Sequence, residues 1–385
     1  PLLHDTVPDN VPWHHVFDYG DADARFAEAD LIVKERFMWH RFTSCPLETV
    51  GAAAQWNEAT RELTIHSNTQ RPGMNLPYIA RALGMARERI RLIVPDIGGG
   101  FGIKTDVYLY QVLVGLMAME TGRPVTYIED RTEHLLWCAH GQDVIYDAEM
   151  AFKSDGSILA LKLRGINDEG AQMRREPVGA ANVVRQPCGP YNFKDLRLDI
   201  YAVLTNKCPV GPNRSYGKMQ QSFILDRLVD IAARRLGMDP VEVRFKNYIQ
   251  PDEQPYEQPS GSIYDGGDYP LALRTAMEIL GYDEVRGEQE AARAAGKLFG
   301  VGFGYGMDST AINTALVRFI GTKNRISGDS ESAWVHMDET GHVEVAFGAI
   351  AQGHGYETTM AQLVADILGL TPADVRVAAG FDSFL

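Results

Sequence analysis

The ten residues Pro95–Lys104, PDIGGGFGIK, decide the fold of this chain. They follow the short apolar run 90–94, which predicts a strand, and they precede an apolar segment that predicts a helix ending at Gly122. Residues 125–129 predict the next strand, and Asp106 is expected to cap the helix. This order of strand, glycine loop, helix and strand favours a mixed α/β (α+β) fold, with mixed sheets flanked by helices.

The glycine loop also indicates a place where the backbone can approach a ligand closely. Gly98–Gly100 and Gly102 leave N–H groups accessible as donors, and Lys104 is expected to add positive charge. The loop is not a P-loop, because no Lys-Ser/Thr pair closes it, and Ile103 stands where a dinucleotide-binding fingerprint needs its last glycine. Spacing alone leaves a tight structural turn as the alternative.

Outward from the loop, strand-like and helix-like segments continue along the whole chain. A boundary near residues 255–300, where a polar Pro- and Gly-rich stretch runs into two helices, divides two α/β halves. The predicted strands are 31–42, 61–67, 144–152, 158–165, 196–204, 300–305, 333–337 and 343–350. The predicted helices are 20–30, 76–83, 217–236, one from 239, 269–280, 284–295 and 356–368.

Composition sets limits on the class of protein. The 385 residues suggest two or three domains, and 45% hydrophobic with 23% charged residues excludes a disordered, collagen-like or disulfide-scaffold chain. A net charge of −14 argues against nucleic-acid binding. The sequence has no apolar run long enough to span a membrane and no signal peptide at Pro1–Asp5, so we expect no membrane association. Four widely spaced cysteines predict thiols in a reducing cytoplasm.

Three further segments carry candidate binding residues, each with an ordinary alternative. Arg214 precedes a predicted helix and could face an oxygen-rich ligand, or could pair with a surface carboxylate. Gln352–Thr358 lies between a strand and a helix, as phosphate-binding helix N-termini do, although His354 could be a packed loop histidine. Gln70 would by itself be an ordinary loop residue.

Taken in order, these segments resemble the molybdenum-binding subunit of the xanthine oxidase family, and they are most similar to the large subunit of aerobic carbon monoxide dehydrogenase and its relatives. The similarity covers nearly the whole chain. The residues that carry it are 46–49, 69–70, 95–104, 122–125, 129–131, 205–207, 214, 245–251, 264–265, 268–272 and 352–361.

The resemblance implies a molybdopterin cofactor, often the cytosine dinucleotide form, whose dithiolene holds the molybdenum so that no protein metal ligand is needed. Gln70 would hydrogen-bond an oxo ligand, and Gly99, Gly100, Phe101 and Gly102 would border the metal. Arg214 would lie in the substrate pocket. The pterin or its pyrophosphate would be held at the helix N-terminus by Gln352, Gly353, His354 and Thr358.

The same resemblance implies a domain organisation. Residues 1–255 would form a first molybdopterin-binding domain, 256–299 a helical linker region, and 300–385 the truncated start of a second such domain. The family's chains normally begin with a further domain and continue past Leu385 to a glutamate that acts as general base. We therefore expect a fragment, or one piece of a split subunit that needs a complementary C-terminal polypeptide.

Three departures bear on the substrate. Ser215 follows Arg214 where carbon monoxide dehydrogenases carry a copper-binding cysteine, and no glutamate matches the one that binds purines. His354 stands where glutamine is usual. The expected function is hydroxylation of an aldehyde or N-heteroaromatic carbon with water-derived oxygen, with electrons passing to 2Fe-2S and FAD partner subunits. The alternatives are a carbon monoxide dehydrogenase and a non-catalytic cofactor-binding piece.

Overall fold

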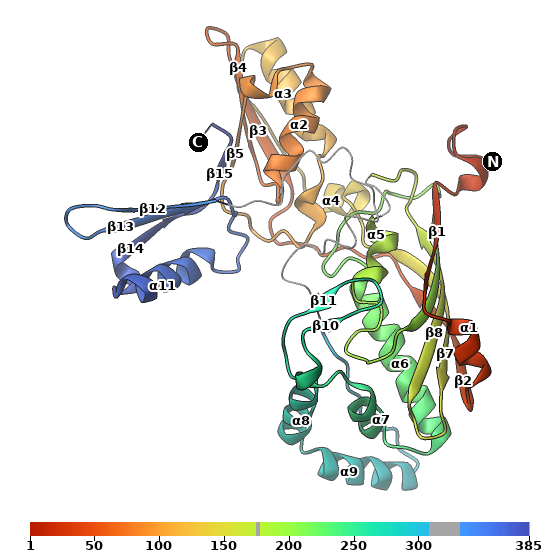
Figure 1. The fold of residues 1–385 in the computed structure, drawn as a ribbon. Helices are drawn as coiled ribbons and strands as arrows, with labels where there is room; N and C mark the ends of the chain where they lie inside the picture. The colour runs from red at the N-terminus through yellow and green to blue at the C-terminus, as the bar shows by residue number, and fades with distance from the viewer. Residues whose placement is uncertain (175–177, 308–331, 385) are drawn as a thin grey trace. The chain divides into compact units, whose positions relative to one another are not determined.

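The computed structural model describes residues 1–174, 178–307 and 332–384, which divide into two units with separate hydrophobic cores. The first unit contains residues 1–41, 142–209 and 215–307. The second contains residues 42–141, 210–214 and 332–384. Each unit is therefore assembled from stretches that lie far apart in the sequence (Figure 1).

A five-stranded sheet organises the first unit. Its strand order is β1-β9-β8-β7-β2, and all neighbours are antiparallel except the parallel pair β8 and β9. Alternate residues are buried along β7 and β9, so one face of the sheet points into the core. The strands are β1 (Trp13–Tyr19), β2 (Leu31–Trp39), β7 (Asp143–Phe152), β8 (Ile158–Asp168) and β9 (Asp195–Val203).

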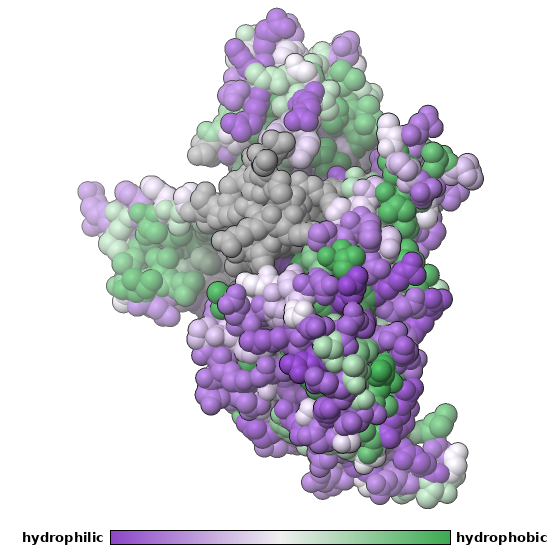
Figure 2. Space-filling view, turned by 45° about the vertical axis from the view of Figure 1, so that its right-hand side comes forward, coloured by the Kyte–Doolittle hydropathy of each residue, from purple (hydrophilic) through white to green (hydrophobic). Residues whose placement is uncertain are grey.

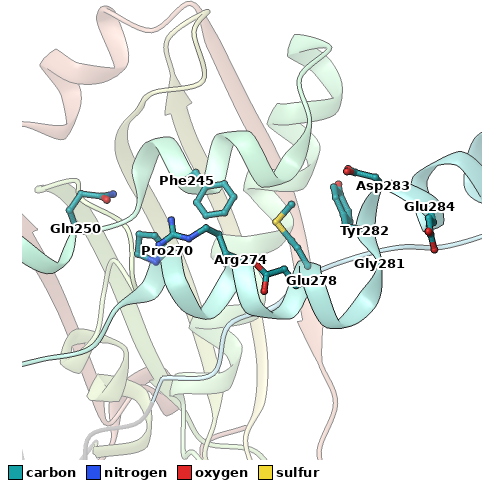
Figure 3. Close-up of a pocket in the computed structure, with 10 residues that line it drawn as sticks. Phe245, Gln250, Pro270, Arg274, Glu278, Gly281, Tyr282, Asp283 and Glu284 are labelled. Carbon is teal, nitrogen blue, oxygen red and sulfur yellow. The ribbon is translucent and has the colours of Figure 1, made fainter.

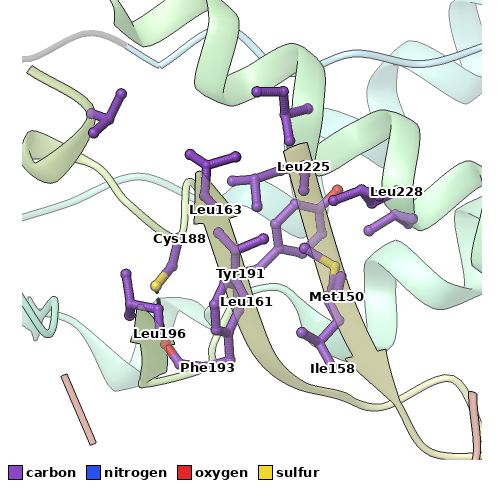
Figure 4. Close-up of a cluster of buried hydrophobic side chains, with 14 of the residues drawn as sticks. Met150, Ile158, Leu161, Leu163, Cys188, Tyr191, Phe193, Leu196, Leu225 and Leu228 are labelled. Carbon is purple, nitrogen blue, oxygen red and sulfur yellow. Dashed lines mark hydrogen bonds between the residues drawn. The ribbon is translucent and has the colours of Figure 1, made fainter. Parts of the chain in front are cut away.

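Helix α6 (Lys218–Leu236) supplies much of the core against that face (Figure 1). Leu225 and Leu228 are fully buried and lie among Met150, Leu161 and other side chains from β7 and β8 (Figure 4). The helix ends at Gly237, whose positive φ of 69° is the left-handed conformation that glycine adopts easily. The remaining elements of this unit are α1 (Ala22–Ala27), α5 (Val178–Ala181), α7 (Pro240–Asn247), β10 (Tyr256–Glu257), β11 (Ile263–Tyr264), α8 (Tyr269–Leu280) and α9 (Tyr282–Ala294).

The second unit contains a mixed sheet of order β15-β5-β4-β3-β6. Strands β4 and β5 are parallel, so their carboxyl ends meet at one edge of the sheet. The strands are β3 (Gly51–Asn57), β4 (Glu62–Ser67), β5 (Ile90–Val94), β6 (Val125–Ile128) and β15 (Phe381–Asp382). Its helices are α2 (Pro72–Leu83), α3 (Leu109–Thr121) and α4 (Arg131–Trp137).

A second, smaller sheet in this unit has the order β12-β13-β14 and packs against α11 (Tyr356–Leu368). Its strands are β12 (Ala333–Met337), β13 (Val343–Phe347) and β14 (Val375–Ala378). Edge strand β12 is exposed along its whole length and includes Trp334, Val335 and Met337. Figure 2 shows apolar side chains gathered on this part of the unit, at the left of the view.

The α/β class and most predicted elements are confirmed, including the strand, glycine loop and helix around residues 90–121. Two predictions are wrong. Residues 300–305 form no strand. Asp106 is not the cap of α3, because Tyr108 occupies that position two residues later. Eight strands and helices were not predicted, namely β1, β3, α4, α5, β10, β11, β14 and β15. None of the helices in the described ranges combines the length and apolar character needed to cross a bilayer.

Candidate functional site

The carboxyl ends of β4 and β5 bring Gln70 and the glycine loop together in the second unit. The Gln70 side-chain oxygen accepts hydrogen bonds from the N–H groups of Gly102 at 2.8 Å and Lys104 at 3.2 Å. Its backbone N–H donates to the Lys104 carbonyl at 2.9 Å. Its amide nitrogen donates to Oε1 of Gln352 at 2.7 Å. Gln70 thus joins two segments that the sequence predicted separately.

The glycine loop needs its glycines for two different reasons. Gly99 and Gly102 have φ values of 90° and 96°, and Phe101 between them also has a positive φ of 54°. Gly100 lacks a positive φ, but a Cβ there would lie 2.3 Å from Cδ of Gln70 and 2.5 Å from Oε1 of Gln352. The two glutamine side chains therefore pack directly against the bare backbone of Gly100.

Gln352 reaches the loop because the segment between β13 and α11 packs onto the core of the larger sheet. Ile350 is buried there, and the Ile97 N–H donates to the Ala351 carbonyl at 2.9 Å. Gly353 and Gly355 have φ values of 93° and 72° and turn the chain into α11.

The other two predicted residues of this segment lie outside that network. The His354 ring lies 4.0 Å from the Tyr356 ring between centroids, and Thr358 is exposed in the first turn of α11. In the described parts of the second unit, the Gln70–Gln352 side-chain bond and the Ile97–Ala351 backbone bond join the glycine loop region to this segment, and no such bond involves His354 or Thr358.

Arg214 also lies against the glycine loop. Its N–H donates to the Phe101 carbonyl at 2.9 Å, and its guanidinium carbon lies 5.8 Å from the centre of the Phe101 ring. Both side chains are exposed, and 41% of Phe101 is accessible. This pair presents a positive charge and an aromatic face side by side.

Lys104 does not add free charge to the loop, contrary to the sequence-based expectation. Its side chain is fully buried, and Nζ lies 2.6 Å from Oε2 of Glu48. The same carboxylate oxygen accepts the Gly98 N–H at 2.8 Å. Burial alone would raise the pKa of Glu48, but hydrogen bonds from Lys104 and Gly98 outweigh it and hold that pKa below its ordinary value. Glu48 thus ties the start of the glycine loop to its end.

Residues 46–50 are in turn held by side chains of residues 129–134, which the sequence did not predict. Oε1 of Glu129 lies 2.5 Å from Nδ1 of His134, with both side chains fully buried, and it accepts the Val50 N–H at 2.8 Å. The Arg131 guanidinium donates to the carbonyls of Pro46 and Leu47. The run 129–131 carried part of the resemblance and was the only signal for this support.

A cavity of about 710 Å³ lies elsewhere, among α7, α8 and α9 of the first unit (Figure 3). The Arg274 guanidinium lies 5.9 Å from the centre of the Phe245 ring in its lining. Glu278, Asp283 and Glu284 add carboxylates. No predicted site residue lines this cavity, and all of them lie in the second unit.

Comparison with known proteins matches residues 3–248 and 275–384 to two models, each described as a molybdopterin cofactor-binding domain. The carbon monoxide dehydrogenase large chain of Afipia carboxidovorans is 32% identical over 99% of this chain and 49% of its own length. The nicotine 6-hydroxylase large subunit of Paenarthrobacter nicotinovorans is 29% identical over 99% of this chain and 46% of its own.

A solved structure matches this chain with similar identity and coverage. The quinoline 2-oxidoreductase of Pseudomonas putida 86 superposes with a TM-score of 0.88 at 33% identity, over 98% of this chain and 48% of that one. The chain therefore spans about half the length of the relatives it matches.

Proposed function

Because this chain belongs to the molybdopterin-binding large subunits of the xanthine oxidase family of molybdenum hydroxylases, we propose that it holds the cofactor of an oxidoreductase that hydroxylates an N-heteroaromatic or aldehyde carbon with water-derived oxygen. The observation that carries the proposal is the Gln70 side chain, which joins the glycine loop to Gln352 in one unit. That contact supports a single cofactor site built from both sequence segments.

The residues present fit the cofactor. No atom lies within 4 Å of where a Cβ of Gly353 would stand, so the backbone at Gly353 is open to a ligand. Helix α11 has 13 residues, and the N–H groups of its first turn have no partner within the helix. Gln352, Gly353, His354 and Thr358 would hold the pterin or its pyrophosphate there, and the cytosine dinucleotide form is the one we propose.

When bound, the cofactor supplies the two-electron oxidation and the transferred oxygen. The chain's own residues orient what reacts. The Gln70 side chain fixes the N–H groups of Gly102 and Lys104 in place, so the loop needs little rearrangement when a charged group approaches. Phe101 offers a face on which a flat substrate can stack. The exposed Arg214 guanidinium can donate hydrogen bonds to a ring nitrogen or carbonyl oxygen.

An N-heteroaromatic substrate has the better support. Two of the relatives are named for nicotine and quinoline, whose rings contain nitrogen. The second candidate, carbon monoxide oxidation, is favoured by the match to a carbon monoxide dehydrogenase large chain. It is opposed by Ser215, because a hydroxyl is a poor ligand for Cu(I) where the resemblance places a thiolate. A non-catalytic cofactor-binding role is the third.

We further propose that turnover requires the rest of the large subunit together with iron–sulfur and FAD subunits, because the chain spans about half of its relatives. The division into domains at 1–255 and 300–385, with 256–299 between them, stays a proposal. So does a cytoplasmic location, which four free cysteines support.

The test is to purify the native complex, measure molybdenum and copper, and identify the released nucleotide. We expect stoichiometric molybdenum, cytosine nucleotide and no matching copper. In isotopically labelled water, the labelled oxygen should appear in the product of quinoline or of an aldehyde. Copper equal to molybdenum, with reduction of the complex by carbon monoxide, would establish the second candidate instead. Full cofactor without turnover of any of these substrates would favour the non-catalytic role.

A further inference from the structure

A group of polar side chains lies on the core face of the first unit's sheet, at one end of β7 and β8. Asp143 pairs with Asp168, Val144 with Asn167 and Tyr146 with Gly165. Continuing that register places Gln142 across from Glu169. Since side chains alternate between the two faces of a strand, Gln142, Tyr146, Asn167 and Glu169 share one face, with cross-strand neighbours about 5 Å apart.

These four side chains are deeply buried, with exposures of 3% for Gln142, 1% for Tyr146, 1% for Asn167 and 5% for Glu169. Within the described residues, five of their polar atoms have no hydrogen-bond partner. They are both amide atoms of Gln142, the Tyr146 hydroxyl, Oδ1 of Asn167 and Oε1 of Glu169. The Asn167 amide nitrogen donates to the Tyr201 carbonyl at 3.2 Å, which fixes its oxygen as the free atom.

Helix α5 and the start of α6 cover this end of the sheet closely. A Cβ on Gly179 would lie 2.9 Å from the Gln142 amide nitrogen and 3.0 Å from the Tyr216 ring. A Cβ on Gly217 would lie 3.3 Å from Oε1 of Gln142. The backbone thus approaches the amide from two sides, and neither glycine offers a side chain that could satisfy it.

Buried polar atoms are hydrogen-bonded in the great majority of native proteins, and each that is not costs the free energy of its lost hydration. Five unsatisfied polar atoms on one face of one sheet would together lower the stability of the fold considerably. We propose that Gln142, Tyr146, Asn167 and Glu169 line a buried binding site for a small uncharged group that both donates and accepts hydrogen bonds. Water has this chemistry, and so does the polar end of an organic ligand.

The charges around the site favour an uncharged occupant. Burial, and then the neighbouring Asp168, raise the pKa of Glu169 to about 7, while Arg41 lowers it. Asp168 is itself matched by Lys207 at 2.7 Å and Arg41 at 3.5 Å. The nearby charged residues are therefore already paired, and Glu169 can donate as an acid or accept as a carboxylate.

The experiment is a high-resolution crystal structure of the native complex, together with thermal unfolding of Tyr146→Phe and Gln142→Met. We expect ordered density within hydrogen-bond distance of at least two of the four side chains. Each variant should lower Tm by about 2–4 °C, because it removes a bond to the occupant. Soaking with formamide, which is uncharged and both donates and accepts hydrogen bonds, separates the two sources: unchanged density identifies water, whereas density of the larger amide identifies an organic polar group.

Tyr201→Phe is the matched control, since Tyr201 lies on the opposite face of the same sheet, stacked on His14 at 4.0 Å between ring centroids. It should leave the density unchanged. Variants that unfold at the same or a higher temperature than the parent, with no density at the four side chains, would overturn the proposal. That result would mean that the polar atoms are unsatisfied and that apolar groups suit the site better. None of these readouts depends on turnover.

Discussion

Replacing Gly100 with alanine should damage the proposed cofactor site without altering the fold around it. The backbone at Gly100 does not have a positive φ, so alanine can adopt its conformation. The added methyl group would lie 2.3 Å from Cδ and 2.4 Å from Nε2 of Gln70, and 2.5 Å from Oε1 of Gln352. Both glutamine side chains must move, and their shared hydrogen bond of 2.7 Å must break.

The size of the effect follows from these contacts. Overpacking of a tight site costs about 1–3 kcal/mol, and a lost hydrogen bond about 1 kcal/mol. If the strain is relieved by displacing Gln70, the N–H groups of Gly102 and Lys104 lose their fixed acceptor as well. A total of about 2–4 kcal/mol corresponds to a loss of about thirtyfold to about a thousandfold in turnover or in cofactor affinity.

The assay measures molybdenum and nucleotide content per complex, and then turnover per molybdenum, for Gly100→Ala beside Gly73→Ala. Gly73 is the control because a Cβ there meets nothing within 4 Å. We expect Gly73→Ala to behave as the parent protein. Gly100→Ala with full cofactor content and parental turnover would refute the reasoning, because the clash would then have been relieved without disturbing the site.

Three further changes test other parts of the structure. Gln70→Ala should lower turnover per molybdenum about tenfold to a hundredfold while most cofactor is retained, and parental turnover at full occupancy would contradict its role. In the parent protein, the pKa of Glu169 is raised from 4.5 to about 7, so the native state binds this proton more tightly than the unfolded state. The free energy of unfolding of the parent should therefore fall by up to about 3 kcal/mol between about pH 4.5 and pH 7. Glu169→Gln, which cannot titrate, should lack this fall. Urea unfolding at about pH 5 and about pH 8 measures this, and an equal difference between variant and parent at both pH values would disprove it. Val335→Lys on the exposed edge strand β12 should reduce aggregation in light scattering without lowering Tm, and unchanged scattering would argue that this edge is already covered.

The elements that sequence predicted well are those with local signals. The glycine loop, its flanking strand and helix, and the caps at Gly84, Gly122 and Gly237 follow from residue chemistry within a few positions. Strand β3 was missed because its residues 51–54, Gly-Ala-Ala-Ala, have neither β-branched nor aromatic side chains, and its pairing with β4 and β6 decides its conformation. Residues 300–305 have strand-like alternation, but no neighbouring strand pairs with them in the described structure.

The site was predictable only as separate pieces. Motif chemistry indicated the glycine loop, Arg214 and the Gln352 segment, and the family resemblance added Gln70. Nothing in their spacing indicates that two glutamine amides meet over Gly100. For Lys104, in contrast, the motif suggested a role that the structure does not support. A lysine in a glycine loop suggests an anion, whereas its burial against Glu48 depends on tertiary packing of a segment 56 residues earlier.

The hydrogen bond between Gln70 and Gln352 spans 282 residues of sequence. A contact of this separation closes a very long loop, and its entropic cost is repaid only when the packing on both sides is in place. During synthesis, Gln70 and the glycine loop would leave the ribosome long before Gln352 exists. The two segments can therefore meet only after residue 352 has been made. Any ligand that needs both segments can accordingly bind only after Gln352 has been synthesised and packed against Gln70.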